Sequence, residues 1–462
     1  MAKNALTQYI DLFRSARNII DSHSSPVLNS RREEACRVLE ETTLPAEGAE
    51  NYEHTDLEKM LAPDFGLNLA GVNIDINPAA SFRCDVPDMQ TMLYLTLNDT
   101  PMPPAPGRGS LPDGVTAGSL KSISLEYPEL VDRYYGRLAS ISNPLVALDT
   151  MLCQDGFMIH VAKGVRVEQP LQLVNILNNG RPLMAVRRVL IVLEEGAELT
   201  LLTCDHTQNP DVEFLALQTV EIYAGPNSRL DFYDMEESTE RTSRLSSLYL
   251  SQEQGSNVLI DGITLFNGTT RNEYHTVFNG SDASLRLLGM GIEDRRRHIE
   301  TYSYVDHKTG HCHTDELMKF VVDDESIASF SGRIYVAPGA VKTEAYQSNR
   351  NIVGSDTARM FSKPQLEIYN DDVKCSHGTA IGQLDPMQLF YMRTRGLEES
   401  TARLLLKQAF MADVIDGVRL DSLRDRLRLL VERRFAGASS ACSSCTRDCG
   451  AVRQDGEPGA EV

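Results

Sequence analysis

The chain has 462 residues, of which 45 are basic and 65 are acidic, so its formal net charge is −20. At about 150 residues per domain, this length predicts two to four domains. Hydrophobic residues make up 42% of the chain, which is enough for a core and excludes wholesale disorder. The excess of acid argues against nucleic acid and against an anionic membrane as partners, because both bind basic surfaces.

No stretch of the sequence is apolar enough to cross a membrane. The longest aliphatic run covers residues 189–193 and is far shorter than the roughly 20 residues that a bilayer needs. The first residues are polar and carry no secretion signal. We therefore expect a cytoplasmic protein, in which thiols stay reduced. Its nine cysteines are then expected to be core residues or ligands rather than disulfide partners.

Residues 1–80 are predicted to form an N-terminal helical domain. Leu6, Ile10 and Phe13 recur at the spacing of one helix face. Pro26 then interrupts this pattern, because the residue before a proline is disfavoured in a helix. Further short helices are expected in the rest of the domain.

From Gly156 the hydrophobic period changes from 3.6 residues to two, which is typical of strands. A unit made of a strand, a polar turn with a glycine and another strand then recurs along the chain. The turn glycines, spaced 29, 30 and 25 residues apart, are Gly196, Gly225, Gly255 and Gly280. A repeat of this length favours a solenoid, with a sandwich or barrel as the alternative. We predict a mainly β fold with a right-handed parallel β-helix core over residues 81–384.

Helical spacing returns after Asp385, which is a good helix N-cap. Two further helices are predicted over about 398–416 and 421–434. These helices form a predicted C-terminal helical domain over residues 385–435. Residues 436–462 are rich in Gly, Ser and Ala and are predicted to be a flexible tail that carries cysteines.

The strongest local candidate for chemistry is the pair Cys375 and His377. If this segment is a strand, both side chains project from the same face, roughly 7 Å apart. A thiolate and an imidazole are good ligands for iron or zinc. Two ligands make only half of a tetrahedral site, so the rest must come from elsewhere, for example from another chain. A buried cysteine beside a surface histidine is the alternative interpretation.

A histidine-rich stretch and the tail are two further candidates for metal binding. The first contains His298, His307, His311, Cys312 and His313. Its spacing matches no zinc-finger or metalloprotease pattern, so histidines bonded to the backbone are the alternative. In the tail, Cys442, Cys445 and Cys449 could bind a soft metal or an iron–sulfur cluster, against the alternative of an incidental reactive tail.

The motifs of several common enzyme classes are absent from the sequence. There is no Gly-x-x-x-x-Gly-Lys, so the chain is not itself a P-loop ATPase. There is also no Gly-x-Ser-x-Gly elbow and no His-Glu-x-x-His motif. Carboxylates are plentiful, but no pair of them can be placed opposite a substrate.

Residues 363–379 read KPQLEIYNDDVKCSHGT, and residues 382–385 and 389–396 read GQLD and LFYMRTRG. This run resembles the signature of the SufB/SufD family, the scaffold proteins of the SUF machinery that assembles iron–sulfur clusters. Upstream, residues 330–336 and 347–349 read FSGRIYV and QSN and are similar to the preceding strands of the family. The resemblance covers most of the chain.

Two details place the chain within this family. Residues 50–57, which read ENYEHTDL, are similar to a looser version of the N-terminal family motif, with Tyr52 where Trp is common. The run Lys-Cys-Ser-His at 374–377 resembles the SufD branch, whereas a SufB-type scaffold has His-Glu-Ala where this chain has His377, Gly378 and Thr379. The cysteine-bearing tail departs from the family pattern.

The resemblance implies a right-handed parallel β-helix between two helical domains and a scaffold role without enzymatic activity. It implies that the β-helix pairs with a SufB-like scaffold. It also implies that the C-terminal helices bind a SufC-like ABC ATPase. The side chains that would contact the ATPase are Met387, Phe390, Tyr391, Arg393, Arg395, Leu406 and Phe410.

The resemblance further implies a role for Cys375 and His377. They match family positions at the interface between the two scaffolds, where iron or a nascent iron–sulfur cluster is held transiently. No permanently bound cofactor is expected. ATP-driven dimerisation of the ATPase would shift the scaffolds and expose these residues. A SufB-type scaffold, a β-helix carbohydrate-active enzyme and a homodimer of the isolated chain remain alternatives.

Overall fold

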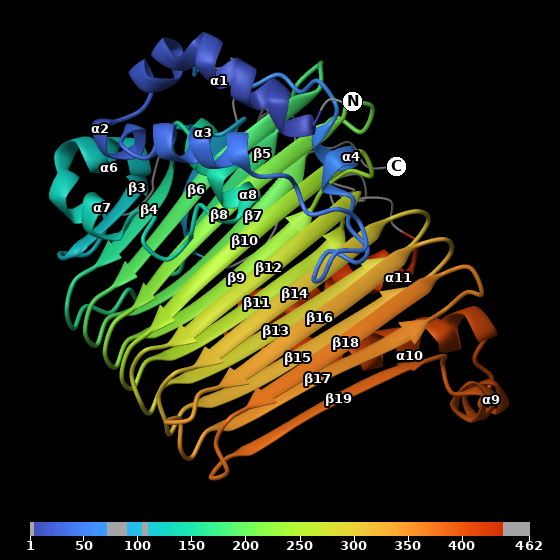
Figure 1. Cartoon of the computed structure of the whole chain (residues 1–462). Coiled ribbons are helices and arrows are strands. Elements are labelled where there is room, and N and C mark those ends of the chain that lie inside the picture. Colours follow the sequence, from blue (N-terminus) through green and yellow to red (C-terminus); the bar gives the residue numbers. More distant parts are fainter. Residues whose placement is uncertain (1–3, 72–89, 104–109, 438–462) are drawn as a thin grey trace, which may run out of the picture.

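The computed structural model describes residues 4–71, 90–103 and 110–437. Its core is a pair of sheets in which nearly all neighbouring strands are parallel (Figure 1). The ten-stranded sheet contains β1 (Met92–Leu97), β2 (Thr100–Pro101), β5 (Leu171–Leu177), β7 (Glu198–Thr207), β9 (Arg229–Glu237), β11 (Asn257–Phe266), β13 (Ser284–Glu293), β15 (His313–Val322), β17 (Glu344–Val353) and β19 (Lys374–Gly382). The nine-stranded sheet contains β3 (Val115–Ser119), β4 (Gly156–Val161), β6 (Leu183–Leu193), β8 (Phe214–Ala224), β10 (Thr242–Gln252), β12 (Thr269–Phe278), β14 (His298–His307), β16 (Ile327–Val336) and β18 (Arg359–Ile368).

From β4 onward the chain alternates between the two sheets, and from β6 onward each strand pairs with the strand two positions earlier. Each coil therefore consists of one strand in each sheet and two turns. In the ten-stranded sheet, for example, Leu230 pairs with Val258 and Val258 pairs with Leu285. This arrangement is a parallel β-solenoid, and it explains why the turn glycines recur about once per coil.

The four predicted turns are confirmed. The residue with a positive φ is the predicted glycine in two of them and another residue in the other two. Gly196 and Gly255 have φ values of +68° and +67°. In the other two turns the left-handed residues are Asn227 and Asp282, with φ values of +55° and +59°. Gly225 instead allows close packing of coils, because a Cβ at that position would lie 2.5 Å from the carbonyl oxygen of residue 193. Glycine, asparagine and aspartate are the residues that best tolerate this conformation.

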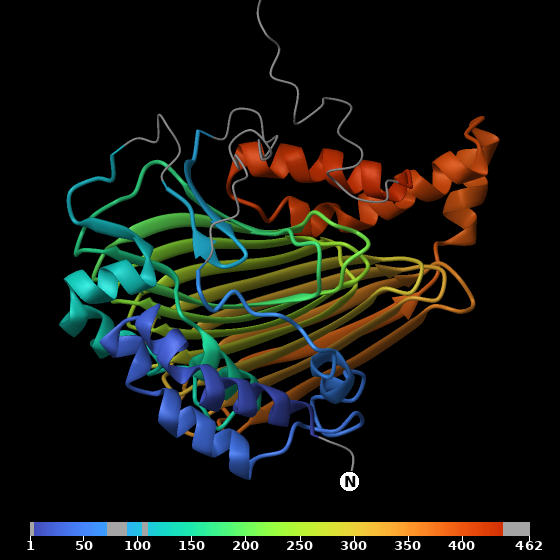
Figure 2. The same ribbon diagram turned by 90° about the horizontal axis from the view of Figure 1, so that it is seen from above.

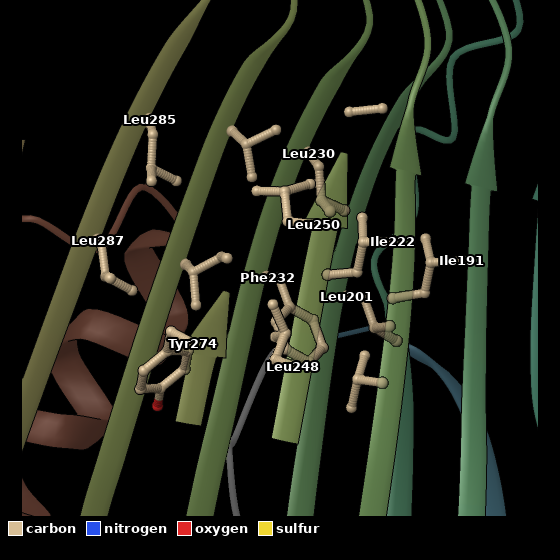
Figure 3. Close-up of a cluster of buried hydrophobic side chains, with 14 of the residues drawn as sticks. Ile191, Leu201, Ile222, Leu230, Phe232, Leu248, Leu250, Tyr274, Leu285 and Leu287 are labelled. Atoms are coloured by element: carbon tan, nitrogen blue, oxygen red, sulfur yellow. The ribbon is translucent and has the colours of Figure 1, made fainter. Parts of the chain in front are cut away.

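The interior between the sheets is apolar over one part of its width and polar over another. Leu201, Phe232 and Leu248 belong to the buried apolar cluster drawn in Figure 3. Elsewhere in the interior, Arg244 donates to Asp205 and Asp234 at 2.7 and 2.6 Å. These buried charges are paired, as the low polarity of the interior requires.

Helices cover the N-terminal part of the outer face of the nine-stranded sheet, over β4, β6, β8 and β10 (Figures 1 and 2). They are α1 (Ala5–Ser22), α2 (Pro26–Asn29), α3 (Arg32–Glu41), α4 (Leu57–Leu61), α6 (Leu120–Glu126), α7 (Pro128–Tyr134) and α8 (Pro144–Leu152). Helices α1, α3, α4 and α8 share one apolar cluster with Met184, Leu215 and Leu245 of the sheet. Helices α6 to α8 lie inside the segment predicted as β-helix and were not expected there. All nine residues of α8 are buried, so it has no polar face and no amphipathic pattern.

The outer face of the ten-stranded sheet is covered by the C-terminal helices α10 (Glu399–Ile415) and α11 (Asp421–Phe435), while the preceding helix α9 (Pro386–Thr394) lies beyond the end of the sheet (Figure 2). The predicted cap is present, since the Asp385 carboxylate accepts a hydrogen bond from the backbone N–H of Met387 at 2.8 Å. Lys319 of the sheet donates to the carbonyl oxygen of Phe410 at 2.7 Å, which ties α10 to β15. No helix of the described part of the chain is long and apolar enough to span a bilayer.

Candidate functional site: the open end of the solenoid

Strands β18 and β19 are the last strands of their sheets, and among the described residues no further strand pairs with their outer edges. Figure 1 shows them at the end of the stack farthest from α1, with α9 beside β19. They contain ten and nine residues. We call this end, with the side chains of β18 and β19, the open end.

The backbone groups on the outer edge of β19 can be assigned from the bonds on its inner edge. The N–H of Lys374 donates to the carbonyl of Thr343 at 2.8 Å, and the carbonyl of Ala380 accepts from the Asn351 side chain at 3.2 Å. Successive residues of a strand direct these groups to opposite sides. The backbone groups of His377 and Thr379 therefore face away from β17 and are available to another strand.

The same argument applies to β18, where the sequence carries a mark of the edge. The N–H groups of Arg359 and Tyr369 donate toward β16, both at 3.0 Å. By alternation, the nitrogen of Pro364 faces the outer edge. Proline occurs within sheets where its nitrogen faces away from the ladder, so β18 is suited to an edge position.

Cys375 and His377 both lie on the inner face of β19. Cys375 pairs with the buried Ala345 and packs against the interior apolar cluster, and His377 pairs with the buried Gln347. Cys375 is half-buried and His377 is exposed. Burial raises the pKa of the Cys375 thiol above its usual value, and a backbone hydrogen bond at Ala345 opposes this shift. The two side chains therefore share one face, as expected, at a position that no later coil covers.

The neighbouring surface carries both polar and apolar side chains. Thr379 donates to the hydroxyl of Ser362 across the two sheets at 2.7 Å. Exposed apolar side chains at or next to this end are Phe361, Ile368, Tyr369 and Ile381. A surface that combines unpaired strand edges with exposed apolar side chains is suited to contact another protein.

The N-terminal motif at residues 50–57 lies against β16 and β18, which the sequence did not predict. Glu53 accepts from Lys363 at 2.7 Å, and Glu50 accepts from Arg333 at 2.6 Å. The ring of His54 stacks on Phe361 with 3.8 Å between the centroids. Both segments had been recognised from their family resemblance, but nothing in either one indicated that they meet.

The side chains predicted to bind an ATPase fall into two groups. Met387, Phe390 and Tyr391 of α9 are 70, 64 and 58% exposed. Arg393 and Arg395 are also exposed, and they bond within the helical region to Glu399 at 3.2 Å and to Tyr391 at 3.0 Å. The α9 set therefore presents a free surface of apolar and basic side chains.

Leu406 and Phe410 of α10 are half-buried instead. Phe410 packs against the cluster between α10 and the ten-stranded sheet, and Lys319 lies 4.6 Å from its ring centroid. The structure thus gives Phe410 a packing role between the helix and the sheet. Sequence spacing placed it on the correct helix but could not distinguish this inner side from the free side.

The described residues contain no group of three or more His, Cys, Asp or Glu side chains that could hold a metal ion. In the histidine-rich stretch, His307 stacks on Phe278 at 4.4 Å and bonds to Thr314 at 2.9 Å. His311 occupies a turn with φ of +59°. The contacts of His307 are thus with side chains, whereas the alternative interpretation predicted bonds to the backbone. The tail candidates Cys442, Cys445 and Cys449 lie outside the described residues.

Comparison with known families places these observations in context. Residues 175–410 match the family model described as SUF system FeS cluster assembly, SufBD core domain. Residues 3–173 match the model of the SufBD protein N-terminal region. The chain belongs to the SufBD family. The two matches together extend from the first helix to α10, so the SufBD membership includes the open end and α9.

Relatives of the SufBD family cover nearly the whole chain. The iron–sulfur cluster assembly protein SufD of Escherichia coli is 27% identical over 95% of this chain and 98% of its own length. SufD of Bacillus subtilis is 24% identical over 79% of this chain and 86% of its own length. An iron–sulfur cluster assembly SufBD family protein of Synechocystis is 27% identical over 90% of this chain and 93% of its own length. The chain is accordingly a SufD-like member of an iron–sulfur cluster assembly family.

Proposed function

We propose that this chain is a non-enzymatic scaffold that pairs with a SufB-like protein through the open end and holds iron or a nascent cluster there. The observation that carries the proposal is that Cys375 and His377 share the inner face of β19, an edge strand. A partner that added a strand to β19 would bring its own side chains next to this pair. It would also bury the exposed apolar residues around it.

Strand addition is a general mode of recognition in which backbone hydrogen bonds supply affinity. On β19 the N–H groups of residues 375, 377, 379 and 381 all face the open edge. On β18 the corresponding row lacks one donor, because Pro364 has no N–H. We therefore assign the more complete pairing to β19.

Two ligands from one chain fit a site that is completed by a partner. A thiolate and an imidazole suit iron, but a tetrahedral site needs two more ligands. Such a site would exist only in the complex, so the cluster or iron is cargo and is not a resident cofactor of this chain. Burial raises the pKa of the Cys375 thiol, so a metal ion that binds the sulfur must displace a proton.

The position of α9 supports coupling to a SufC-like ATPase. Only residues 383–385 separate β19 from α9, whose exposed side chains form a surface free to bind a partner. Helix α10 is tied to β15 by Lys319. A force applied to α9 by an ATPase that changes shape would therefore reach β19 through a short connection.

The pairing is tested by the substitution Thr379→Pro, which removes an N–H on the open edge of β19. Thr379→Ala is the matched control, because it also loses the bond to Ser362 but keeps the N–H. The variants are produced together with a SufB-like scaffold and a SufC-like ATPase, and the recovered complex is quantified. We expect Thr379→Pro to lose the scaffold partner and Thr379→Ala to retain it.

Equal recovery of the partner with both variants would contradict pairing through β19. A further result concerns the isolated chain, which would elute as a dimer in the wild type and in Thr379→Ala but as a monomer in Thr379→Pro. That result would show that the same edge also pairs with a second copy of the chain. Membership of the SufBD family removes the basis for the carbohydrate-active alternative. The SufD relatives argue against a SufB-type scaffold.

A further inference from the structure

A row of three side chains crosses the inner face of the ten-stranded sheet and ends at the open end. Glu316 of β15 pairs with Gln347 of β17, and Gln347 pairs with His377 of β19. Paired residues on neighbouring strands lie about 4.8 Å apart and point to the same side. The carboxyl, the amide and the imidazole are therefore consecutive members of one row.

The inner two members of this row are buried and hydrogen-bonded to each other. Glu316 is fully buried, and Gln347 is 2% exposed. The amide nitrogen Nε2 of Gln347 donates to Oε2 of Glu316 at 2.7 Å. Burial raises the pKa of Glu316 to about 7, and the hydroxyl of Ser303 opposes this shift. When Glu316 is ionised, the bond sets the direction of the amide, because a carboxylate can accept from the nitrogen but not from the oxygen.

The amide oxygen of Gln347 is left without a partner among the described residues. A buried acceptor that stays unpaired costs about 1–3 kcal/mol, so such groups are normally satisfied. The opposite sheet places the hydroxyl of Ser303 beside Glu316 and has Gly332 opposite the amide of Gln347. A Cβ at residue 332 would lie 2.3 Å from Nε2 of Gln347, so glycine leaves the space that the amide occupies.

We infer that Glu316 and Gln347 position the imidazole of His377, with the free amide oxygen of Gln347 accepting the N–H of one ring nitrogen. The other ring nitrogen then keeps its lone pair and faces outward from the row. Glu316 acts one step further away, because it holds the amide in the direction that presents its oxygen.

The consequence for metal binding rests on the proposed function. A histidine ligand binds metal through a ring nitrogen that carries no proton, and a hydrogen bond at the other nitrogen fixes this tautomer. Loss of such a supporting acceptor typically weakens metal binding about 10- to 100-fold. Gln347 and Glu316 are thus positioning residues for His377 and do not themselves touch the metal.

The ring tautomer is measured by nitrogen NMR on the metal-free full chain labelled with ¹⁵N-histidine, with the His377 signal assigned by its loss in His377→Ala. We expect one dominant tautomer in the wild type and a mixture in Gln347→Met. Gln347→Glu restores the dominant tautomer, because its carboxyl oxygen can accept the same N–H. Glu316→Gln shifts the ratio in the same direction as Gln347→Met, but less.

Gln218→Met is the matched control. The side chain of Gln218 on β8 is as buried as that of Gln347 and also points into the solenoid, but Gln218 is not paired with His377. It should leave the His377 tautomer unchanged. The same tautomer ratio in the wild type, Gln347→Met and Glu316→Gln would overturn the inference. If the melting curve shows that Gln347→Met does not fold, the inference is tested by comparing the tautomer ratio of the near-isosteric Glu316→Gln with that of the wild type.

Anaerobic addition of Fe²⁺ to the same samples separates this inference from the proposed function. We expect Fe²⁺ to perturb the His377 signal in the wild type and to need about 10- to 100-fold higher concentration in Gln347→Met. A wild-type signal that Fe²⁺ leaves unchanged would contradict the proposed role of His377 as a ligand. The tautomer result on the metal-free chain would still support the positioning of the ring.

Discussion

The two ends of the solenoid are built differently. At the N-terminal end the outermost strands are short and antiparallel: β2 has two residues and β3 has five. At the C-terminal end the outermost strands β18 and β19 have ten and nine residues and are parallel to their neighbours. Proteins prevent unwanted pairing by shortening and covering sheet edges. At one end the sheet edges are thus short, whereas the other end leaves two long edges open among the described residues, as the proposed pairing with a second scaffold requires.

The first way to sharpen this comparison is a substitution near the N-terminal end of the solenoid. Arg188 of β6 is fully buried and lies 3.1 Å from Asp149 of α8 and 3.4 Å from Glu221. Arg188→Met would leave both carboxylates without their cation, so we expect a loss of about 3–5 kcal/mol in the free energy of unfolding. Urea unfolding followed by circular dichroism measures it.

The control for this prediction lies close to the open end. Arg333 of β16 is 24% exposed and is paired with Glu50. Arg333→Met should cost about 1 kcal/mol or less, because exposed ion pairs contribute little. Equal losses in the two variants would contradict the view that buried charges hold the covered part together.

The second prediction concerns the surface of α9 beside the open end. Phe390 is 64% exposed, so Phe390→Ala should leave the free energy of unfolding nearly unchanged. If Phe390 anchors the ATPase, the truncation costs about 2 kcal/mol of binding, or roughly a 30-fold weaker complex. Calorimetric titration with the ATPase measures this.

Leu429 of α11 provides the control for Phe390, because it is also an exposed apolar residue but lies outside the predicted set. Leu429→Ala should bind the ATPase with wild-type affinity. If Leu429→Ala weakens the complex as much as Phe390→Ala does, the contact surface is not centred on α9.

The third and smallest effect is a pH dependence under the C-terminal helices. Asp261 of β11 is fully buried with no hydrogen-bond partner for either oxygen among the described residues. It pairs with Tyr233, whose hydroxyl accepts from the backbone N–H of Arg419 between α10 and α11. Burial raises the pKa of Asp261 to about 7, and Arg286 opposes this shift.

The folded chain therefore keeps a proton on Asp261 at a pH where the unfolded chain has lost it. Stability should fall as the pH rises from about 5.5 to 7, by up to about 1.4 kcal/mol per pH unit from this group. Asp261→Asn removes this contribution, so the difference in the free energy of unfolding between variant and wild type should change over that range. A constant difference would show that Asp261 does not titrate there.

The sequence predicted the elements whose signals are local. The glycines at 196 and 255 marked real turns, and Asp385 capped a real helix. Helix α8 was not predicted because it is buried on every side and has no polar stripe. Sequence spacing also could not show that Phe410 faces the sheet, since the partner surface lies about 90 residues away on β15.

The candidate site was predictable only in part. Alternation in a strand placed Cys375 and His377 on one face. It could not show that β19 is the last strand, that Gln347 stands beside His377, or that residues 50–54 reach β16 and β18. Gln347 and His377 are 30 residues apart, and Glu53 and Lys363 are 310 residues apart, so these contacts follow only from how the coils stack. The role of the pair as cluster ligands remains a prediction.

The central claim is that the open end is where a cluster forms in a complex of two scaffolds. The most direct measurement is the iron and acid-labile sulfide content of the complex with the SufB-like scaffold and the ATPase, isolated without oxygen. We predict that Cys375→Ala and His377→Ala retain both partners while iron and sulfide fall about tenfold or more. Intact complexes with wild-type amounts of iron and sulfide in both variants would contradict the claim.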